Sequence, residues 1–420
     1  MRFSIVNLGC KVNRVESDAV AAQLLERGAE ACEPAAADLI VVNTCTVTGE
    51  AEKKTRKAVR QALRANDTAR VIVTGCAAAL KPEAFEEMSP RVVCVPKAQL
   101  GAAVSREADA LEPRSPLPHD GRPGLLRIGG EFPTRVGVKV QDGCNNACTY
   151  CIVHVARGRA TSRDIDEVAG ECAAYARAGV KEIVLTGINL GSYRQRRADG
   201  TSLRLSDLLK RLLDDTADLH VDGAPASRFR ISSIEPRDVD EDLIELLGSS
   251  DGRVCRHLHL PLQAGSSKVL REMARPYDAA FFVDLVARLR AAAPSISLST
   301  DIIAGFPGET DAEFEETLSV ARACSFSKIH AFPYSIRRGT PAAERCDQIP
   351  PEVKDERAAR LRVLGDELRS LEFSRRVGTR EAVLVEQDGR GMTESYFEIP
   401  VPTGLPAGSL VELTLSEVLS

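Results

Sequence analysis

The sequence predicts an α/β protein in three parts: an N-terminal domain with a parallel sheet, a larger part of six β-α units, and a small antiparallel β module. Short apolar runs alternate with helical segments through most of the 420 residues, which is typical of β-α-β units. A stretch dense in Pro and Gly interrupts the alternation, and the C-terminal end has only short apolar runs. These observations predict domains at 1–112, 134–371 and 374–420, with a linker at 113–133.

The composition is that of an ordinary soluble globular protein, with 44% hydrophobic and 27% charged residues. The first residues lack the pattern of a signal peptide, and no run of eighteen apolar residues predicts a membrane helix. We therefore expect a cytoplasmic protein with no membrane partner, whose twelve cysteines stay reduced. The net charge of −5 gives no sign of an overall affinity for nucleic acid.

The N-terminal domain is predicted from four apolar strands separated by helical segments. The strands are expected at 3–8, 38–43, 70–75 and 91–95, and the helices at 16–27, 50–64 and 82–88. Cys10, Cys45 and Cys76 each follow the end of a strand. Because parallel strands end at one edge of a sheet, these thiols are expected to share a site that suits an iron–sulfur cluster with one open iron. The alternative is three buried small hydrophobic residues.

The second part favours a (βα)6 barrel, complete or partial. Its strands are expected at 136–141, 182–187, 229–234, 257–262, 296–306 and 328–335. Helices are expected at 164–178, 203–215, 279–292, 310–323 and 352–375. The short runs at 380–387, 394–401 and 409–415 predict the antiparallel module.

Three further cysteines lie on one loop directly after the first strand of this part. Cys144, Cys148 and Cys151 occur in QDGCNNACTYC. Three thiolates at this spacing hold a [4Fe–4S] cluster and leave one iron without a protein ligand. A structural zinc site is the alternative, and it would need a fourth ligand such as His154.

Several other residues at predicted strand ends are candidates for a binding site. Three of them are glycines, Gly187, Gly191 and Gly305. A glycine at such a place lets the backbone approach a ligand closely, or it serves only to turn the chain from strand to helix. Glu235 and Gln263 are candidates for polar contacts with a cofactor or substrate. His257 and His259 share one side of a strand, where packing is the favoured interpretation for each.

Basic residues are clustered although the total charge is slightly negative. The clusters occur at 53–70, 157–163 and 194–197. Such runs are typical of a solvated face, and close to strand ends they also suit a phosphate-binding surface. The C-terminal module is acidic, with four arginines and seven acidic residues over 374–420.

The cysteine loop, with Tyr150 before its last cysteine, resembles the radical S-adenosylmethionine superfamily. Together with the N-terminal cysteines and the β module, it resembles the methylthiotransferase family over almost the whole chain. The segments that carry the resemblance are NLGCKVNRVESD, VNTCTVT, QDGCNNACTYCIV, TGINLGSY, SSIEP, HLPLQAGS, AGFPGET and FPYSIRRGT. They are most similar to the enzymes that methylthiolate N6-threonylcarbamoyladenosine at position 37, in the anticodon loop of tRNA.

This resemblance implies a Rossmann-like N-terminal domain, a radical S-adenosylmethionine partial barrel and a TRAM-like β barrel. It implies two [4Fe–4S] clusters, one on Cys144, Cys148 and Cys151 that binds S-adenosylmethionine, and an auxiliary one on Cys10, Cys45 and Cys76. The 5′-deoxyadenosyl radical then activates C2 of the adenine, where sulfur and a methyl group are added.

Tyr150 is expected beside the S-adenosylmethionine adenine, and glycines 187, 191 and 305 are expected near this cofactor. The reaction also requires a reducing electron donor and a sulfur donor. The alternatives are a sister methylthiotransferase acting on isopentenyladenosine or on a ribosomal-protein aspartate, and a non-catalytic iron–sulfur or zinc RNA-binding module.

Overall fold

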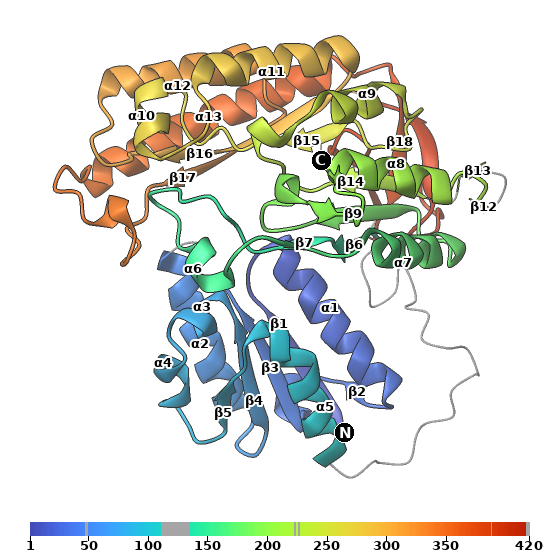
Figure 1. The fold of residues 1–420 in the computed structure, drawn as a ribbon, viewed down its shortest axis with the longest axis vertical. Coiled ribbons are helices and arrows are strands. Elements are labelled where there is room, and N and C mark those ends of the chain that lie inside the picture. The colour runs from blue at the N-terminus through green and yellow to red at the C-terminus, as the bar shows by residue number, and fades with distance from the viewer. Residues whose placement is uncertain (47–48, 111–133, 222–223, 226, 388, 417–420) are drawn as a thin grey trace. The chain divides into compact units, whose positions relative to one another are not determined.

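The computed structural model describes the chain except for residues 47–48, 111–133, 222–223, 226, 388 and 417–420. The predicted linker at 113–133 therefore lies outside the described residues. The chain forms two compact units (Figure 1): unit 1 is Met1–Leu126 with Cys151–Arg159, and unit 2 is Arg127–Tyr150 with Ala160–Ser420. Both contain parallel sheets, which confirms the predicted α/β class. In the part of the chain that is described, no helix is long and apolar enough to cross a membrane.

Unit 1 is built on a five-stranded parallel sheet in the order β2-β1-β3-β4-β5. Its strands are β1 Arg2–Asn7, β2 Glu30–Ala31, β3 Leu39–Thr44, β4 Arg70–Gly75 and β5 Val92–Cys94. Its helices are α1 Lys11–Glu26, α2 Gly49–Ala65, α3 Cys76–Leu80, α4 Glu83–Glu86, α5 Leu100–Ala110 and α6 Val153–Arg157. The four predicted strands are present, and the two-residue β2 is an additional edge strand.

Helices cover both faces of this sheet because successive side chains of a strand point to opposite faces. On β3, Leu39 and Val41 pack in one cluster with residues of α1 and α5. Ile40 and Val42 pack in a second cluster with residues of α2, α3 and α4. A strand that is buried on both faces has a continuous run of apolar residues, which is why LIVV at 39–42 could be recognised as a strand from the sequence.

Unit 2 contains all six strands that the sequence predicts in this region, with all pairings parallel. They are β6 Val136–Lys139, β9 Glu182–Thr186, β14 Arg228–Ile231, β15 His257–His259, β16 Ser297–Ala304 and β17 Lys328–Pro333. They form two three-stranded sheets, β14-β9-β6 and β15-β16-β17. The backbone N–H of Ile234, beyond β14, donates to the carbonyl of His259 on β15 at 3.1 Å. Closure of the six strands into a barrel stays a prediction.

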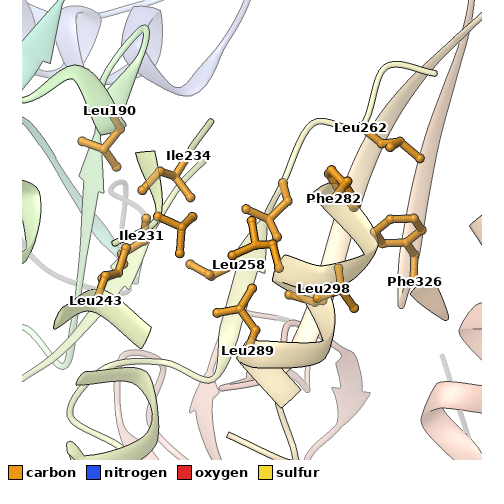
Figure 2. Packing of buried hydrophobic residues seen from close by; sticks show 14 of the residues in the cluster. Leu190, Ile231, Ile234, Leu243, Leu258, Leu262, Phe282, Leu289, Leu298 and Phe326 are labelled. Carbon is orange, nitrogen blue, oxygen red and sulfur yellow. The ribbon is translucent and has the colours of Figure 1, made fainter. Parts of the chain in front are cut away.

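One apolar core joins these strands to their helices. The helices are α7 Ile165–Arg177, α8 Leu205–Asp215, α9 Glu241–Ser249, α10 Ser267–Glu272, α11 Ala279–Ala292, α12 Asp311–Cys324 and α13 Pro351–Ser374. Figure 2 shows Leu258 and Leu298, on neighbouring strands, in the same cluster as Phe282 and Leu289 of α11. The apolar side chains of β15 and β16 thus face helices, and alternation directs the residues between them to the opposite face.

The C-terminal part is a four-stranded antiparallel sheet in the order β20-β19-β18-β21. Its strands are β18 Arg380–Val385, β19 Arg390–Thr393, β20 Glu398–Pro400 and β21 Leu410–Thr414. The antiparallel arrangement was predicted, but β19 was missed because its sequence, RGMT, contains no apolar run.

Candidate functional site

The three N-terminal cysteines lie at the carboxyl edge of the sheet in unit 1. Cys10 is the residue before α1, Cys45 follows β3, and Cys76 begins α3 directly after β4. Cys45 and Cys76 are buried, whereas Cys10 is exposed. This is the edge at which open parallel sheets bind ligands.

Shared neighbours bring these three cysteines together. The thiol of Cys10 lies 3.7 Å from Oδ1 of Asn13, and the same oxygen accepts a hydrogen bond from Arg157 at 2.6 Å. Nε of Arg157 in turn lies 3.3 Å from Sγ of Cys76. A Cβ on Gly9 would lie only 2.9 Å from Cβ of Cys45, so the loop before Cys10 packs directly on Cys45.

Arg157 is the central cation of this edge, and its side chain is only 1% exposed. It also donates to Oε1 of Glu16 at 2.9 Å, and Lys97 pairs with the same carboxylate. Burial and the neighbouring Arg157 lower the pKa of Lys97, although Glu16 opposes this shift. Arg157 thus places a buried positive group beside Cys76, at the edge that carries all three cysteines.

The donor set of this edge fits a cluster better than a single metal ion. Among the described residues, the sulfur atoms of Cys10, Cys45 and Cys76 do not all come within 4.8 Å of one another. Three thiolates on one tetrahedral zinc ion lie closer together, because each Zn–S bond is about 2.3 Å long. A [4Fe–4S] cluster holds its cysteines on separate iron atoms and therefore accommodates a wider arrangement.

The second cysteine set is divided between the two units, so Cys144 and Cys148 are described in unit 2 and Cys151 in unit 1. Sγ of Cys148 accepts a hydrogen bond from Arg275 at 3.2 Å. Sγ of Cys144 accepts from the backbone N–H of Asn146 at 3.4 Å, and burial raises the pKa of this thiol. In unit 1, Sγ of Cys151 accepts from the N–H of Val153 at 3.5 Å.

Arg275 connects two predicted site residues to Cys148. Its side chain is 3% exposed, and its guanidinium pairs with Glu235 and lies 3.4 Å from the hydroxyl of Tyr150. It also contacts the hydroxyl of Tyr277 at 3.0 Å. Burial alone would lower the pKa of Arg275, but the Tyr150, Glu235 and Tyr277 side chains raise it overall. The buried Arg275 next to Cys148 therefore stays charged.

The three predicted glycines have protein atoms beside them. A Cβ added at Gly187 would lie 2.8 Å from Oε1 of Gln141. One added at Gly191 would lie 2.3 Å from Cβ of Asp238, and one added at Gly305 would lie 2.2 Å from Cγ of Lys354. Close packing within unit 2 thus accounts for each glycine, and a contact with a cofactor stays a prediction.

The backbone of Gln263 is held by the strand beside it. Its N–H donates to the carbonyl of Asp301 and its carbonyl accepts from Ile303, both at 2.9 Å. No described contact tests a role of its side chain toward a cofactor, so that role also stays a prediction.

Comparison with known proteins gives two family matches. Residues 138–321 match the radical SAM superfamily, and residues 2–96 match a family described as uncharacterized protein family UPF0004. The two matched segments contain all six predicted cluster cysteines.

Curated relatives cover most of the chain. It is 39% identical to the threonylcarbamoyladenosine tRNA methylthiotransferase MtaB of Bacillus subtilis, over 86% of this chain and 79% of the relative. It is 34% identical to the tRNA-2-methylthio-N(6)-dimethylallyladenosine synthase of Desulfotalea psychrophila, over 92% of this chain and 88% of that relative.

A solved structure supports the fold. The radical S-adenosylmethionine methyltransferase TsrM from Kitasatospora setae superposes with a TM-score of 0.57 at 16% identity, covering 81% of this chain and 77% of that chain.

Proposed function

Since the chain belongs to the radical S-adenosylmethionine methylthiotransferase family, we propose that it adds a methylthio group to C2 of N6-threonylcarbamoyladenosine 37 in tRNA. The observation that carries this proposal is the 39% identity to the MtaB enzyme over most of both chains. The relative that modifies dimethylallyladenosine is 34% identical, which makes the sister reaction the second candidate.

We propose that Cys144, Cys148 and Cys151 hold the cluster that binds S-adenosylmethionine, and that Cys10, Cys45 and Cys76 hold the auxiliary cluster. When bound, the first cluster supplies reductive cleavage of S-adenosylmethionine and the second supplies an iron at which sulfur is held for transfer. The six cysteines would hold these groups in place, and each set has a guanidinium beside one cysteine: Arg275 next to Cys148 and Arg157 next to Cys76.

The substrate is tested by nucleoside mass spectrometry of tRNA from a strain that lacks this gene. We expect the 2-methylthio form of N6-threonylcarbamoyladenosine to disappear and its unthiolated precursor to accumulate. Restoring the gene should restore the modified nucleoside. Loss of the methylthio form of isopentenyladenosine instead would favour the sister reaction and contradict the proposed substrate.

A basic stripe on α2 supports tRNA as the partner. Lys53, Lys57, Arg60 and Arg64 are all exposed and recur at the spacing of one helix face. Their separations of four, three and four residues align them along the helix, where they can contact successive phosphates.

We expect the double substitution Lys57→Glu with Arg60→Glu to raise the Kd for tRNA at least about tenfold, because two phosphate contacts become repulsive. Fluorescence anisotropy at several salt concentrations measures this Kd. The slope of log Kd against log salt concentration should decrease by the equivalent of about two phosphate contacts. The matched control is Lys328→Glu with Arg362→Glu, two exposed positions on unit 2. An equal loss of affinity in both variants would show that α2 is not a specific contact.

A further inference from the structure

Three donor side chains on neighbouring strands of unit 2 form a group that the proposed reaction does not use. His259 ends β15, Asp301 lies within β16 and His330 lies within β17. One imidazole nitrogen from each histidine and one carboxylate oxygen all lie within 4.8 Å of one another. No other three His, Cys, Asp or Glu side chains of the described residues meet this condition.

Strand register places all three on one face of the sheet. Asp301 pairs with His330 across β16 and β17, and His259 pairs with Ser299 across β15 and β16. Ser299 and Asp301 are two residues apart and therefore share a face. Leu258 and Leu298 belong to the opposite face, which packs against helices (Figure 2). The donor group therefore lies on the face of the sheet away from this apolar core.

The distance between His259 and Asp301 fits two ligands of one metal ion. Nε2 of His259 lies 3.4 Å from Oδ2 of Asp301. A hydrogen bond to a carboxylate is normally about 2.7–2.9 Å long, so this contact is longer than such a bond, although it lies within ion-pair range. Two ligands bound to a metal ion at about 2.0–2.2 Å each lie roughly 3.2–3.5 Å apart.

The other nitrogen of His259 has a hydrogen-bond partner, as the second nitrogen of a metal-ligating histidine usually does. Nδ1 lies 3.0 Å from Oγ of Ser299, and Oγ also lies 2.9 Å from Nε2 of His257. A ligating histidine usually gives its second N–H to such a group, which fixes the tautomer. If Ser299 donates to His257 and accepts from His259, the lone pair of His259 Nε2 is directed to the Asp301 side.

We propose that His259, Asp301 and His330, which belong to neither proposed cluster, form a binding site for a divalent transition-metal ion. Two imidazoles and one carboxylate are the ligands of zinc sites and of non-haem iron(II) sites. The site is partly open, with side-chain exposures of 14% for His259 and 33% for Asp301. Three protein ligands leave further coordination positions for water or another oxygen donor.

The test uses the protein with both clusters loaded, to which one equivalent of Zn²⁺ is added anaerobically before gel filtration. Elemental analysis should find about one zinc per chain, with the iron content unchanged. X-ray absorption at the zinc edge should show nitrogen and oxygen neighbours near 2.0–2.2 Å. Sulfur neighbours near 2.3 Å would place the zinc on cysteines and overturn the proposal.

Variants identify the ligands. His330→Phe keeps a ring beside Phe332 but removes the donor, and it should retain less than about a tenth of the zinc. His330→Glu restores a donor and should bind zinc again, whereas the nearly isosteric Asp301→Asn should weaken binding at least about tenfold. His220→Ala, at an exposed position, is the control and should bind like the parent. Undiminished zinc in folded His330→Phe and Asp301→Asn would overturn the site.

Discussion

Replacing Cys45 with alanine is expected to abolish methylthiolation while S-adenosylmethionine is still cleaved. Cys45 follows β3 at the edge of unit 1, and Gly9 packs directly on it. Losing one of three proposed ligands removes the auxiliary cluster and so the sulfur to be transferred. Because loss of even a supporting contact of a metal site costs about 10–100-fold, loss of a ligand should lower thiolation by more than about 100-fold.

Cleavage is measured as 5′-deoxyadenosine, and thiolation by mass spectrometry of the product nucleoside. Cys94→Ala is the matched control, because Cys94 ends β5 of the same sheet and burial raises its pKa to about 12. It should retain both activities, whereas Cys148→Ala should lose both. If Cys45→Ala thiolates like Cys94→Ala, the auxiliary site has been assigned to the wrong cysteines.

Replacing Glu182 with glutamine is expected to lower the free energy of unfolding by about 3–5 kcal/mol, because it leaves two buried arginines uncompensated. Glu182 is fully buried on β9 and pairs with Arg228 and Arg230 of β14, at 2.8 and 2.6 Å. The remaining guanidinium N–H groups donate to four carbonyls of the C-terminal sheet, those of Ala382, Met392, Thr393 and Glu394. This triad thus fastens the antiparallel sheet to the strands of unit 2.

Chemical denaturation measures the effect, with Asp242→Asn as the control. Asp242 pairs with Lys210 at 2.8 Å on the surface, where its loss should cost less than about 1 kcal/mol. If Glu182→Gln lowers the free energy of unfolding by no more than the control does, the triad does not stabilise the attachment of the antiparallel sheet.

The pH dependence of the same variant gives a second check. Burial alone would raise the pKa of Glu182, but Arg230 and Arg228 lower it well below its ordinary value of 4.5. A lowered folded-state pKa means that the carboxylate stabilises the fold at every pH above about 4.5 and loses this effect as the pH falls further. The difference in the free energy of unfolding between the parent and Glu182→Gln should therefore be constant near neutral pH and should shrink below pH about 4.5.

The strands were predictable because their signals are local. Runs such as LIVV at 39–42 are buried on both faces of a parallel sheet, and the structure places β3 there. The beginning of α1 was predicted at residue 16 but lies at Lys11, directly after Cys10. KVNR contains only one apolar residue, so hydrophobic periodicity is weak where the helix begins.

The charged residues around the cysteines were not predictable from spacing. Arg275 is 127 residues from Cys148, and Arg157 is 81 residues from Cys76. Arg157 belongs to a basic run, which was interpreted only as a solvated face or a phosphate-binding surface. Arg275 stands in REMARPY, which carries no recognisable pattern.

The sequence by itself determined the α/β class, the two sets of three cysteines and the family, because these depend on local periodicity and on the order of residues along the chain. Only the tertiary structure decided which distant side chains lie together: Arg157 with Cys76, Arg275 with Cys148, Glu182 with its two arginines, and, at a partly open site, His259 with Asp301 and His330. A buried charge must find its partner wherever the fold brings one, and that partner leaves no periodic signal in the chain.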